Sequence, residues 1–470
     1  MSGLASEASG TVPANADADA EPRRDERVST LRADAFPEAA VRHRALVGPA
    51  GAFPEADRYG RSLFGAEPAD PGARGDGVDA LRLVPPVFMP RRLEKLIDLA
   101  REPVFQDVDL ETWIGGFRCA LPLYVSAFGS TEAASVDLGA AAGRQAGRLG
   151  IPLVIGENVM PVNGYGRVAG AEGATSERSL LTRIRAYAAG ARDGYGGVVV
   201  QQSTEDADAE VWNLVYSDPN ARPLLESGRL AFELKVGQGA KPGLGGMTLV
   251  DRAAAARLAG AFTIDPVLGE ESDKVLRCSS PGTFTQEILR QQVRLMRNNF
   301  PRAKVWVKLT PARDVREAAL TAWAAGADAV TVDGAEGGSG WAPISFLQHV
   351  GLPLAECLRR VGRPPGPASL LVSGRMWEGA RVAKCLALGA AAAGLGRAAL
   401  LAVDADPEAG LVNLVECLAL ELRLLTSAMG KYRVGELSRE DLWSPGPESL
   451  APEADLVADA DGVRVGADGF

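Results

Sequence analysis

Histidine and cysteine are scarce in this 470-residue chain, and their scarcity limits its chemistry. The only histidines are His43 and His349, so a Ser-His-Asp triad or a two-histidine metal site is nearly excluded. The five cysteines lack the short spacings that zinc and iron–sulfur sites use. They are Cys119, Cys278, Cys357, Cys385 and Cys417. We expect reduced, mostly buried thiols and no bound metal.

Basic charge and long apolar runs are also in short supply. Lys and Arg total 50 against 60 Asp and Glu, a formal net charge of −10, and no basic run is interleaved with aromatic residues. Nucleic acid is therefore not an expected partner. No stretch approaches the roughly 20 apolar residues of a membrane span. Residues 1–27 lack the apolar core of a secretory signal, so the sequence predicts a cytoplasmic protein.

Composition divides the chain into a middle part and two extensions. Residues 1–80 are rich in Ala, Asp, Glu, Arg, Pro and Gly with little periodicity, which is typical of a flexible or surface-wrapping arm. The tail, 438–470, is rich in Pro and Asp and should be peripheral. The part between 121 and 437 carries the pattern of an ordered domain.

A leader, 81–120, connects the arm to that domain. Leu93, Leu96 and Ile97 share one face of a predicted short helix, and we expect this face to pack on the main body. Residues 113–116, Trp-Ile-Gly-Gly, are expected to begin a strand or a turn.

Short apolar runs alternate with amphipathic helical stretches throughout 121–437, which indicates βα units and a parallel sheet. The strand candidates are 121–126, 151–155, 197–202, 230–237, 304–309, 328–332, 369–373 and 391–396. The helix candidates are 137–149, 177–192, 206–225, 285–299, 315–325, 346–361, 378–388 and 408–429. Eight units predict a (β/α)8 TIM barrel, with a doubly wound sheet as the alternative. The unusually long connection 238–283 would form a lid at the barrel's carboxyl-end face.

Glycine-rich turns follow the last three predicted strands. They lie at 333–340, at Gly374, and at Gly394 and Gly396, where Arg397 adds a charge. Loop geometry explains a single glycine turn, but three at successive strand ends favour a phosphate held by backbone N–H groups. The sequence predicts a phosphate-bearing ligand there.

Lys308 is a charge in an otherwise apolar strand candidate, Val305 to Leu309. Such a charge is costly to bury without a partner. A flavin ring would provide one, and a core carboxylate is the alternative.

Four segments then point to a family. They are Ala127-Phe128-Gly129-Ser130, Gln238-Gly239-Ala240-Lys241-Pro242-Gly243, Arg277-Cys278-Ser279-Ser280-Pro281-Gly282 and His349-Val350-Gly351-Leu352-Pro353. In this order they resemble the FMN-binding domain of glutamate synthases and of single-domain glutamate-synthase-like proteins. The resemblance runs from about Pro103 to Leu437.

The resemblance implies an FMN across the barrel mouth and an amino acid or 2-oxo acid above it. The implied cofactor-binding residues are Ser126, Ala127, Phe128, Gln201, Lys308, Asp333, Gly337, Gly338, Gly374, Gly394, Gly396 and Arg397. In the catalytic group, Gln238 and Lys241 would grip the substrate carboxylate, Arg277 could assist, and Glu157 would stand near the substrate. The alternative is that the lid residues form surface ion pairs.

The sequence departs from the family in ways that affect function. The three-cysteine motif of the iron–sulfur centre is missing after the eighth strand candidate, and we expect no amidotransferase at the N-terminus. Electrons or amine would then come from a separate protein. Cys278 stands where the family usually has His, and 203–206 replaces a segment that usually contains Arg.

The sequence thus predicts an FMN-dependent, glutamate-synthase-like oxidoreductase. It would act on a C–N bond of an amino or 2-oxo acid, with hydride transfer between the substrate carbon and flavin N5. A redox-neutral flavin isomerase or lyase, and a flavin-binding subunit of a larger complex, are the alternatives. A 2-hydroxy-acid oxidase is disfavoured, because no histidine base lies near the seventh strand candidate. A homo-oligomer is left open.

Overall fold

The computed structural model describes most of the chain between residues 36 and 444. The described residues are 36–52, 77–128, 138–156, 180–203, 211–237, 247–253, 255, 259–260, 262–267, 270–278, 284–337, 343, 346 and 349–444.

Eight parallel strands close into a barrel, in the order β11-β12-β13-β14-β4-β5-β6-β7. They are β4 (Leu123–Phe128), β5 (Leu153–Ile155), β6 (Val198–Gln202), β7 (Leu230–Lys235), β11 (Lys304–Leu309), β12 (Ala329–Asp333), β13 (Ser369–Ser373) and β14 (Ala392–Leu395). Each overlaps a predicted strand, so the (β/α)8 prediction is confirmed. Closure rules out the doubly wound alternative, because such a sheet has two free edges.

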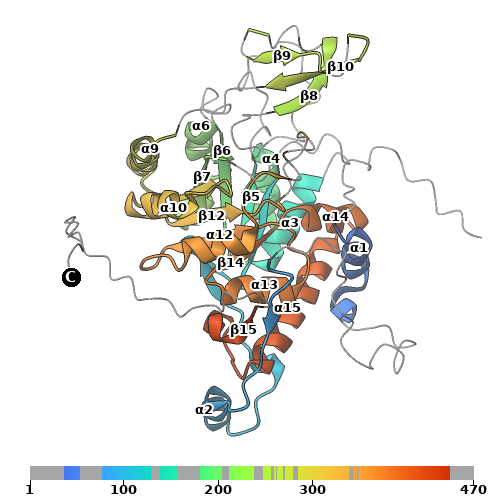
Figure 1. The fold of residues 1–470 in the computed structure, drawn as a ribbon, viewed down its shortest axis with the longest axis vertical. Helices are drawn as coiled ribbons and strands as arrows, with labels where there is room; N and C mark the ends of the chain where they lie inside the picture. The colour runs from blue at the N-terminus through green and yellow to red at the C-terminus, as the bar shows by residue number, and fades with distance from the viewer. Residues whose placement is uncertain are drawn as a thin grey trace, which may run out of the picture.

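Helices follow the strands and cover the outside of the barrel (Figure 1). They are α3 (Leu138–Leu149), α4 (Leu180–Gly190), α6 (Val211–Ser217), α7 (Arg222–Glu226), α9 (Gln286–Asn299), α10 (Val315–Ala324), α12 (Leu354–Val361), α13 (Gly379–Ala387), α14 (Arg397–Ala405) and α15 (Gly410–Ala428). Outward strand residues pack on them in the main hydrophobic cluster.

Two predicted helices are interrupted in the structure, and proline explains both. The helix expected over 206–225 is two helices, α6 and α7, in the described residues, because Pro219 interrupts it. The helix expected over 346–361 is interrupted: Phe346 and His349 are helical, but α12 begins at Leu354, after Pro353. Residue 352, before that proline, is biased away from the helical region. Helix α14, at 397–405, was not predicted.

A hairpin closes the amino-terminal end of the barrel. It consists of β2 (Thr112–Ile114) and β3 (Phe117–Cys119), which confirms the strand and turn expected at 113–116. Trp306, fully buried inside the barrel, donates a hydrogen bond from Nε1 to the Gly115 carbonyl (3.0 Å). A second apolar cluster fills this half of the interior. Ligands can therefore enter only from the carboxyl ends of the strands.

Gly115 gives a test of this packing. A Cβ on Gly115 would lie 2.3 Å from Trp306 Nε1, and its φ of +53° is one that side chains rarely adopt. We expect Gly115→Ala to lower the free energy of unfolding by about 1–3 kcal/mol, measured by urea denaturation. Gly194→Ala is the matched control, because Gly194 has a φ of +72° but open space around its Cβ position. An equal loss in both variants would attribute the effect to φ alone.

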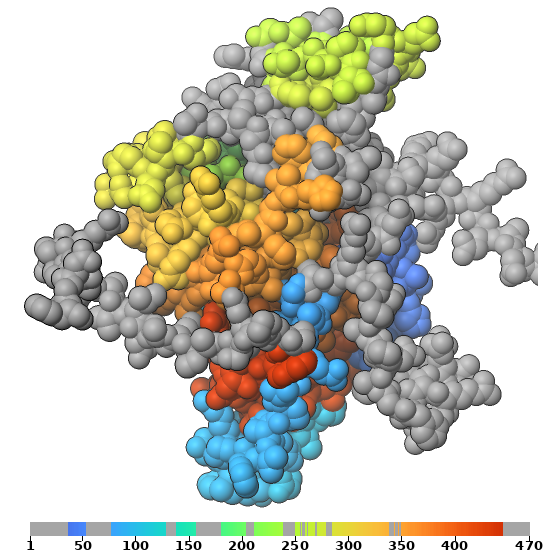
Figure 2. Space-filling view, viewed as in Figure 1, coloured from blue at the N-terminus to red at the C-terminus, as the bar shows by residue number. Residues whose placement is uncertain are grey.

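The long connection after β7 contains a small sheet that the sequence did not predict. Strands β8 (Met247–Asp251), β9 (Thr263–Asp265) and β10 (Lys274–Cys278) pair antiparallel in the order β8-β10-β9. Figures 1 and 2 show this sheet at one end of the molecule and α2 (Pro90–Leu99) at the other.

Helix α2 forms as predicted, but its packing prediction was wrong. Leu93 and Ile97 are 59% and 68% exposed, and no residue of the helix is buried. Polar contacts attach the helix instead. Arg91 pairs with Glu436 (2.7 Å), and Arg92 donates to the Tyr432 hydroxyl (2.8 Å).

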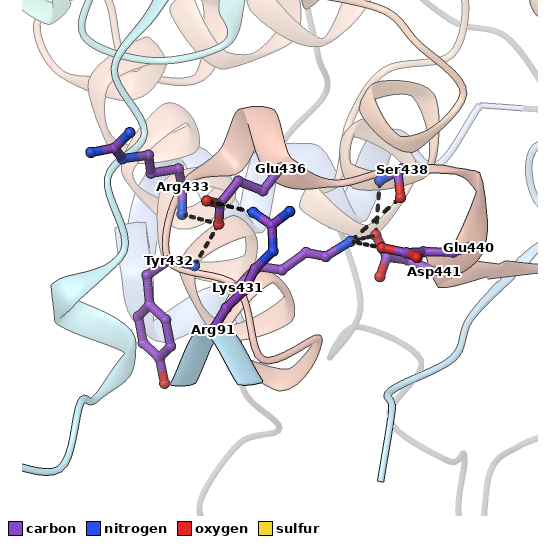
Figure 3. A network of polar contacts seen from close by, with 8 residues as sticks. All are labelled: Arg91, Lys431, Tyr432, Arg433, Glu436, Ser438, Glu440 and Asp441. Atoms are coloured by element: carbon purple, nitrogen blue, oxygen red, sulfur yellow. Dashed lines mark hydrogen bonds and ion pairs between the residues drawn. The ribbon is translucent and has the colours of Figure 1, made fainter. Parts of the chain in front are cut away.

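The residues after α15 provide these partners (Figure 3). Lys431, itself buried, pairs with Glu440 (2.8 Å) and Asp441 (2.7 Å). The short helices η5 (Val434–Glu436) and η6 (Arg439–Asp441) carry the acidic groups. Strand β15 (Leu442–Trp443) then pairs with β1 (Arg82–Leu83), which ties the leader to the C-terminal part. The leader also contains η4 (Phe105–Asp107).

Part of the predicted arm is folded. Residues 36–52 form α1 (Glu38–Val47) and η2 (Gly48–Ala52), and α1 packs on α14 and α15. Its Val41 and Ala45 are fully buried.

Candidate active site

The carboxyl-end half of the barrel interior is lined by buried polar side chains. Glu233 of β7 is 1% exposed. The Gln201 side chain of β6 donates from Nε2 to Glu233 Oε2 (2.6 Å), and the Thr331 hydroxyl of β12 donates to Oε1 (3.0 Å). On its own strand, each of the three lies two residues after a member of the apolar cluster inside the barrel. Strand residues two apart share a face, so all three side chains point inward.

A buried ion pair lies beside this group. Lys308 of β11 and Asp333 of β12, 5% and 4% exposed, are joined by a 3.0 Å contact between Nζ and Oδ2. The hydroxyl of Ser373, on β13, donates to the other oxygen of Asp333. In the structure the partner of Lys308 is thus a core carboxylate, which was the alternative to a flavin ring. The structure also brings together two cofactor-binding candidates.

Burial raises the pKa of the Glu233 carboxyl, because a charge there loses its hydration. The positive charge of Lys308 and the hydrogen bonds from Gln201 and Thr331 act in the opposite direction, and Asp333 adds to the increase. Two carboxyl groups therefore share one ammonium in this interior. Glu233 holds its proton to higher pH than an exposed glutamate does.

Glycine-lined strand ends form a cradle at the same end of the barrel. Gly374 follows β13 with a φ of +132°, and a Cβ there would lie 3.6 Å from the backbone nitrogens of Gly334 and Gly337. The guanidinium of Arg381, fully buried in α13, donates two bonds to the Gly374 carbonyl (3.2 and 3.3 Å). The same guanidinium pairs with Asp79 (2.6 Å). Arg381 thus fixes the backbone of the cradle.

Helix α14 begins beside this cradle. Gly396 precedes it, with only Ser126 Cβ (3.9 Å) near its Cβ position, and Arg397 is its first residue. The first N–H groups of a helix have no intrahelical partner and favour an anion. A phosphate group of a cofactor therefore fits between the ends of β13 and β14. At position 394, packing and not ligand binding requires a glycine, because the Tyr124 ring occupies the place of a Cβ atom there.

The remaining sequence-predicted residues lie in three places. Ser126 and Ala127 lie near the carboxyl end of β4, where the register with β5 is irregular, and Ala127 packs on the interior apolar cluster. Phe128 is the last residue of that strand. Arg277 lies on β10, with its guanidinium 4.5 Å from the Phe262 ring centroid. Glu157, Gln238, Lys241 and Gly338 lie outside the described residues.

Sequence reasoning missed Glu233, Thr331, Ser373 and Arg381. The signal for Glu233 was present, since it alternates with the inward-facing Ala231 and is a charge in a predicted strand. Thr331 and Ser373 gave no comparable signal, because short hydroxyl side chains are common in strands.

Over the described part of the chain, no three His, Cys, Asp or Glu side chains are grouped to hold a metal ion. The absence of an iron–sulfur centre stays a prediction. All five cysteines are free, and four are buried as expected. Burial raises the pKa of Cys357 to about 12 and that of Cys417 to about 11. No helix in the described ranges is long and apolar enough to cross a membrane.

The conserved region in glutamate synthase matches residues 224–406. Over this stretch, the glutamate synthase region, the chain is similar to glutamate synthases. It includes Glu233, Lys308, Asp333, Gly374 and Arg397, so most of the buried polar cluster and the cradle lie in the glutamate synthase region. The match confirms the resemblance that the motifs predicted.

Two curated relatives show the extent of the likeness. A glutamate synthase large subunit-like protein of Rhizobium meliloti is 36% identical over 185 residues, 38% of this chain and 40% of that protein. The archaeal glutamate synthase (NADPH) of Methanocaldococcus jannaschii is 33% identical over 180 residues, 37% of this chain and 34% of that protein. The chain thus spans less than half the length of these relatives.

A solved structure supports the fold. A mutant of the active chimera of (S)-mandelate dehydrogenase is 18% identical, with a TM-score of 0.51. The alignment covers 87% of this chain and 99% of that chain. At this identity the likeness shows the barrel fold alone.

Proposed function

We propose that this chain binds FMN at the carboxyl ends of the barrel strands and is an oxidoreductase acting on a C–N bond of an amino acid or 2-oxo acid. The observation that carries the proposal is the buried ammonium of Lys308 in the same barrel end as a glycine-lined cradle, both inside the glutamate synthase region. FMN, when bound, supplies hydride and electron transfer at its ring.

The residues of the chain would serve this chemistry through charge and hydrogen bonding. Lys308 would stabilise negative charge on the pyrimidine edge of the ring. Gln201 donates its amide N–H to Glu233, which leaves its oxygen to accept a bond from a ligand N–H. Gly374 and Arg397 would hold the phosphate.

The substrate contacts are proposed from the sequence motif. Gln238 and Lys241 would bind the carboxylate, with Arg277 and Glu157 in assisting roles. A separate protein would deliver electrons or amine. This fits the relatives' names, which include a large subunit-like protein.

The proposal is tested on the purified full chain. We expect one FMN per chain, released on denaturation, and bleaching of its absorbance when a substrate amino acid is added without oxygen. Release of FAD, or no retention of added FMN, would overturn the cofactor assignment. Bound FMN that no amino acid reduces, but that catalyses isomerisation once chemically reduced, would favour the redox-neutral alternative.

Lys241 provides a separate prediction about the substrate. Lys241→Ala should lower turnover about ten- to a hundredfold, because a charge-assisted bond to a carboxylate contributes roughly 1.5–3 kcal/mol. FMN content should not change. Lys274→Ala is the control, since Lys274 lies in the same connection but forms an exposed pair with Asp251 (2.6 Å). Normal steady-state kinetics for Lys241→Ala would remove Lys241 from the site.

A further inference from the structure

The folded part of the N-terminal arm is clamped to the helices that follow the last barrel strand. Arg42 pairs with Asp404 of α14 (2.8 Å), and Arg44 pairs with Glu421 of α15 (2.6 Å). The Asn413 side chain donates to the Ala45 carbonyl (2.9 Å). Figure 1 shows α1 lying alongside α14. These contacts fix the position of the arm relative to the start of α14.

Phe36, just before α1, contacts the first residue of α14. Its ring is buried, and the Arg397 guanidinium carbon lies 5.3 Å from the ring centroid. Arg42 and Arg44 each have a carboxylate partner, whereas no ion pair joins Arg397 to any described carboxylate. Burial lowers the pKa of Arg397, and among the described residues no acidic side chain offsets this effect.

The kind of partner matters for anion binding. A carboxylate would orient the guanidinium but would also compete with an incoming phosphate. An aromatic face orients the guanidinium through its ring electrons and leaves all the N–H donors free. Restricting a long side chain before binding also reduces the entropy lost when the ligand arrives.

We propose that Phe36 is a positioning residue, whose ring holds the Arg397 guanidinium at the start of α14 where it meets the cofactor phosphate. This rests on the proposed FMN function. The N-terminal arm would then have a part in cofactor affinity that lies outside the glutamate synthase region, which begins at residue 224.

The first measurement is the dissociation constant of FMN for the flavin-depleted protein, obtained from the quenching of flavin fluorescence on binding. Phe36→Leu should raise it about three- to tenfold, the range expected for loss of a partly buried cation–π contact. Phe36→Tyr keeps the ring face and should stay within about twofold of wild type. Val41→Ala, which creates a cavity under the adjoining helix α1, should lower the melting temperature without a comparable change in FMN affinity. Phe36→Met is a second ring-free variant if Phe36→Leu folds poorly.

A double-mutant cycle separates positioning from packing. If Phe36 acts through Arg397, Phe36→Leu should have no further effect in the Arg397→Gln background. An equal increase in both backgrounds, or unchanged affinity in Phe36→Leu, would overturn the positioning role while FMN binding stands. A wild-type chain that binds no FMN would overturn the proposed function and this inference together.

Discussion

Lys308→Met is expected to lower the free energy of unfolding by about 3–5 kcal/mol, measured by urea denaturation at neutral pH. Methionine has similar length but removes the ammonium that pairs with the buried Asp333 at 3.0 Å. Removing one partner of a buried pair leaves an uncompensated charge, which is among the largest single-residue penalties in proteins. Glu233 adds to this penalty, since its carboxyl interacts with the charges of both Lys308 and Asp333.

A double variant shows whether the penalty comes from Asp333. Lys308→Met with Asp333→Asn removes both charges, so most of the lost stability should return. The matched surface control is Lys274→Met, whose exposed pair with Asp251 should contribute less than about 1 kcal/mol. If the single and double variants were equally destabilised, the loss would come from packing and not from the unpaired carboxylate.

The Lys308 variants also separate structure from cofactor chemistry. The double variant should fold, yet it lacks the ammonium proposed to face the flavin. We therefore expect weaker FMN retention and a lower flavin reduction potential than in the wild type. A refolded double variant with unchanged potential would assign Lys308 to the core alone.

The barrel could be predicted because each strand carries its own signal. Short apolar runs such as 198–202 and 304–309 show burial on both faces, and the amphipathic stretches between them require crossover helices. Lys308 was visible for the same reason, since a charge in such a run needs a partner. The partner of Lys308 could not be predicted from the sequence, because Asp333 approaches Lys308 only when β11 and β12 pair in one particular register.

The parts that failed depend on tertiary packing or on proline. The amphipathic pattern of α2 predicted the helix but not its orientation, which is set by Arg91 and Arg92 binding the residues after α15. The sheet β8-β10-β9 forms within a connection whose strands are short and far apart in sequence, so its sequence gives little periodicity. Phe36 contacts a residue more than 350 positions away, and no local pattern reveals such a contact.

Glu233, a site residue that the sequence did not predict, should make the stability of the protein depend on pH. Its carboxyl accepts bonds from Gln201 and Thr331, so Glu233→Leu leaves two buried donors without that acceptor. Each costs roughly 1–3 kcal/mol. We expect a loss of about 2–6 kcal/mol in the free energy of unfolding at low pH, where Glu233 is protonated in both states. Glu233→Gln keeps the size and an acceptor, and should be affected much less at low pH.

The pH dependence follows from the sign of the pKa shift. The folded pKa of Glu233 is raised above its ordinary value of 4.5, so the folded state binds this proton more tightly than the unfolded state does. Between the two pKa values the folded state therefore carries more protons, and the free energy of unfolding falls as pH rises. Glu233→Gln cannot ionise and lacks this contribution. Its stability relative to wild type should increase from pH 4.5 upward and level off above the folded pKa. Parallel stability curves for the two proteins would show that the fold does not raise the pKa of Glu233.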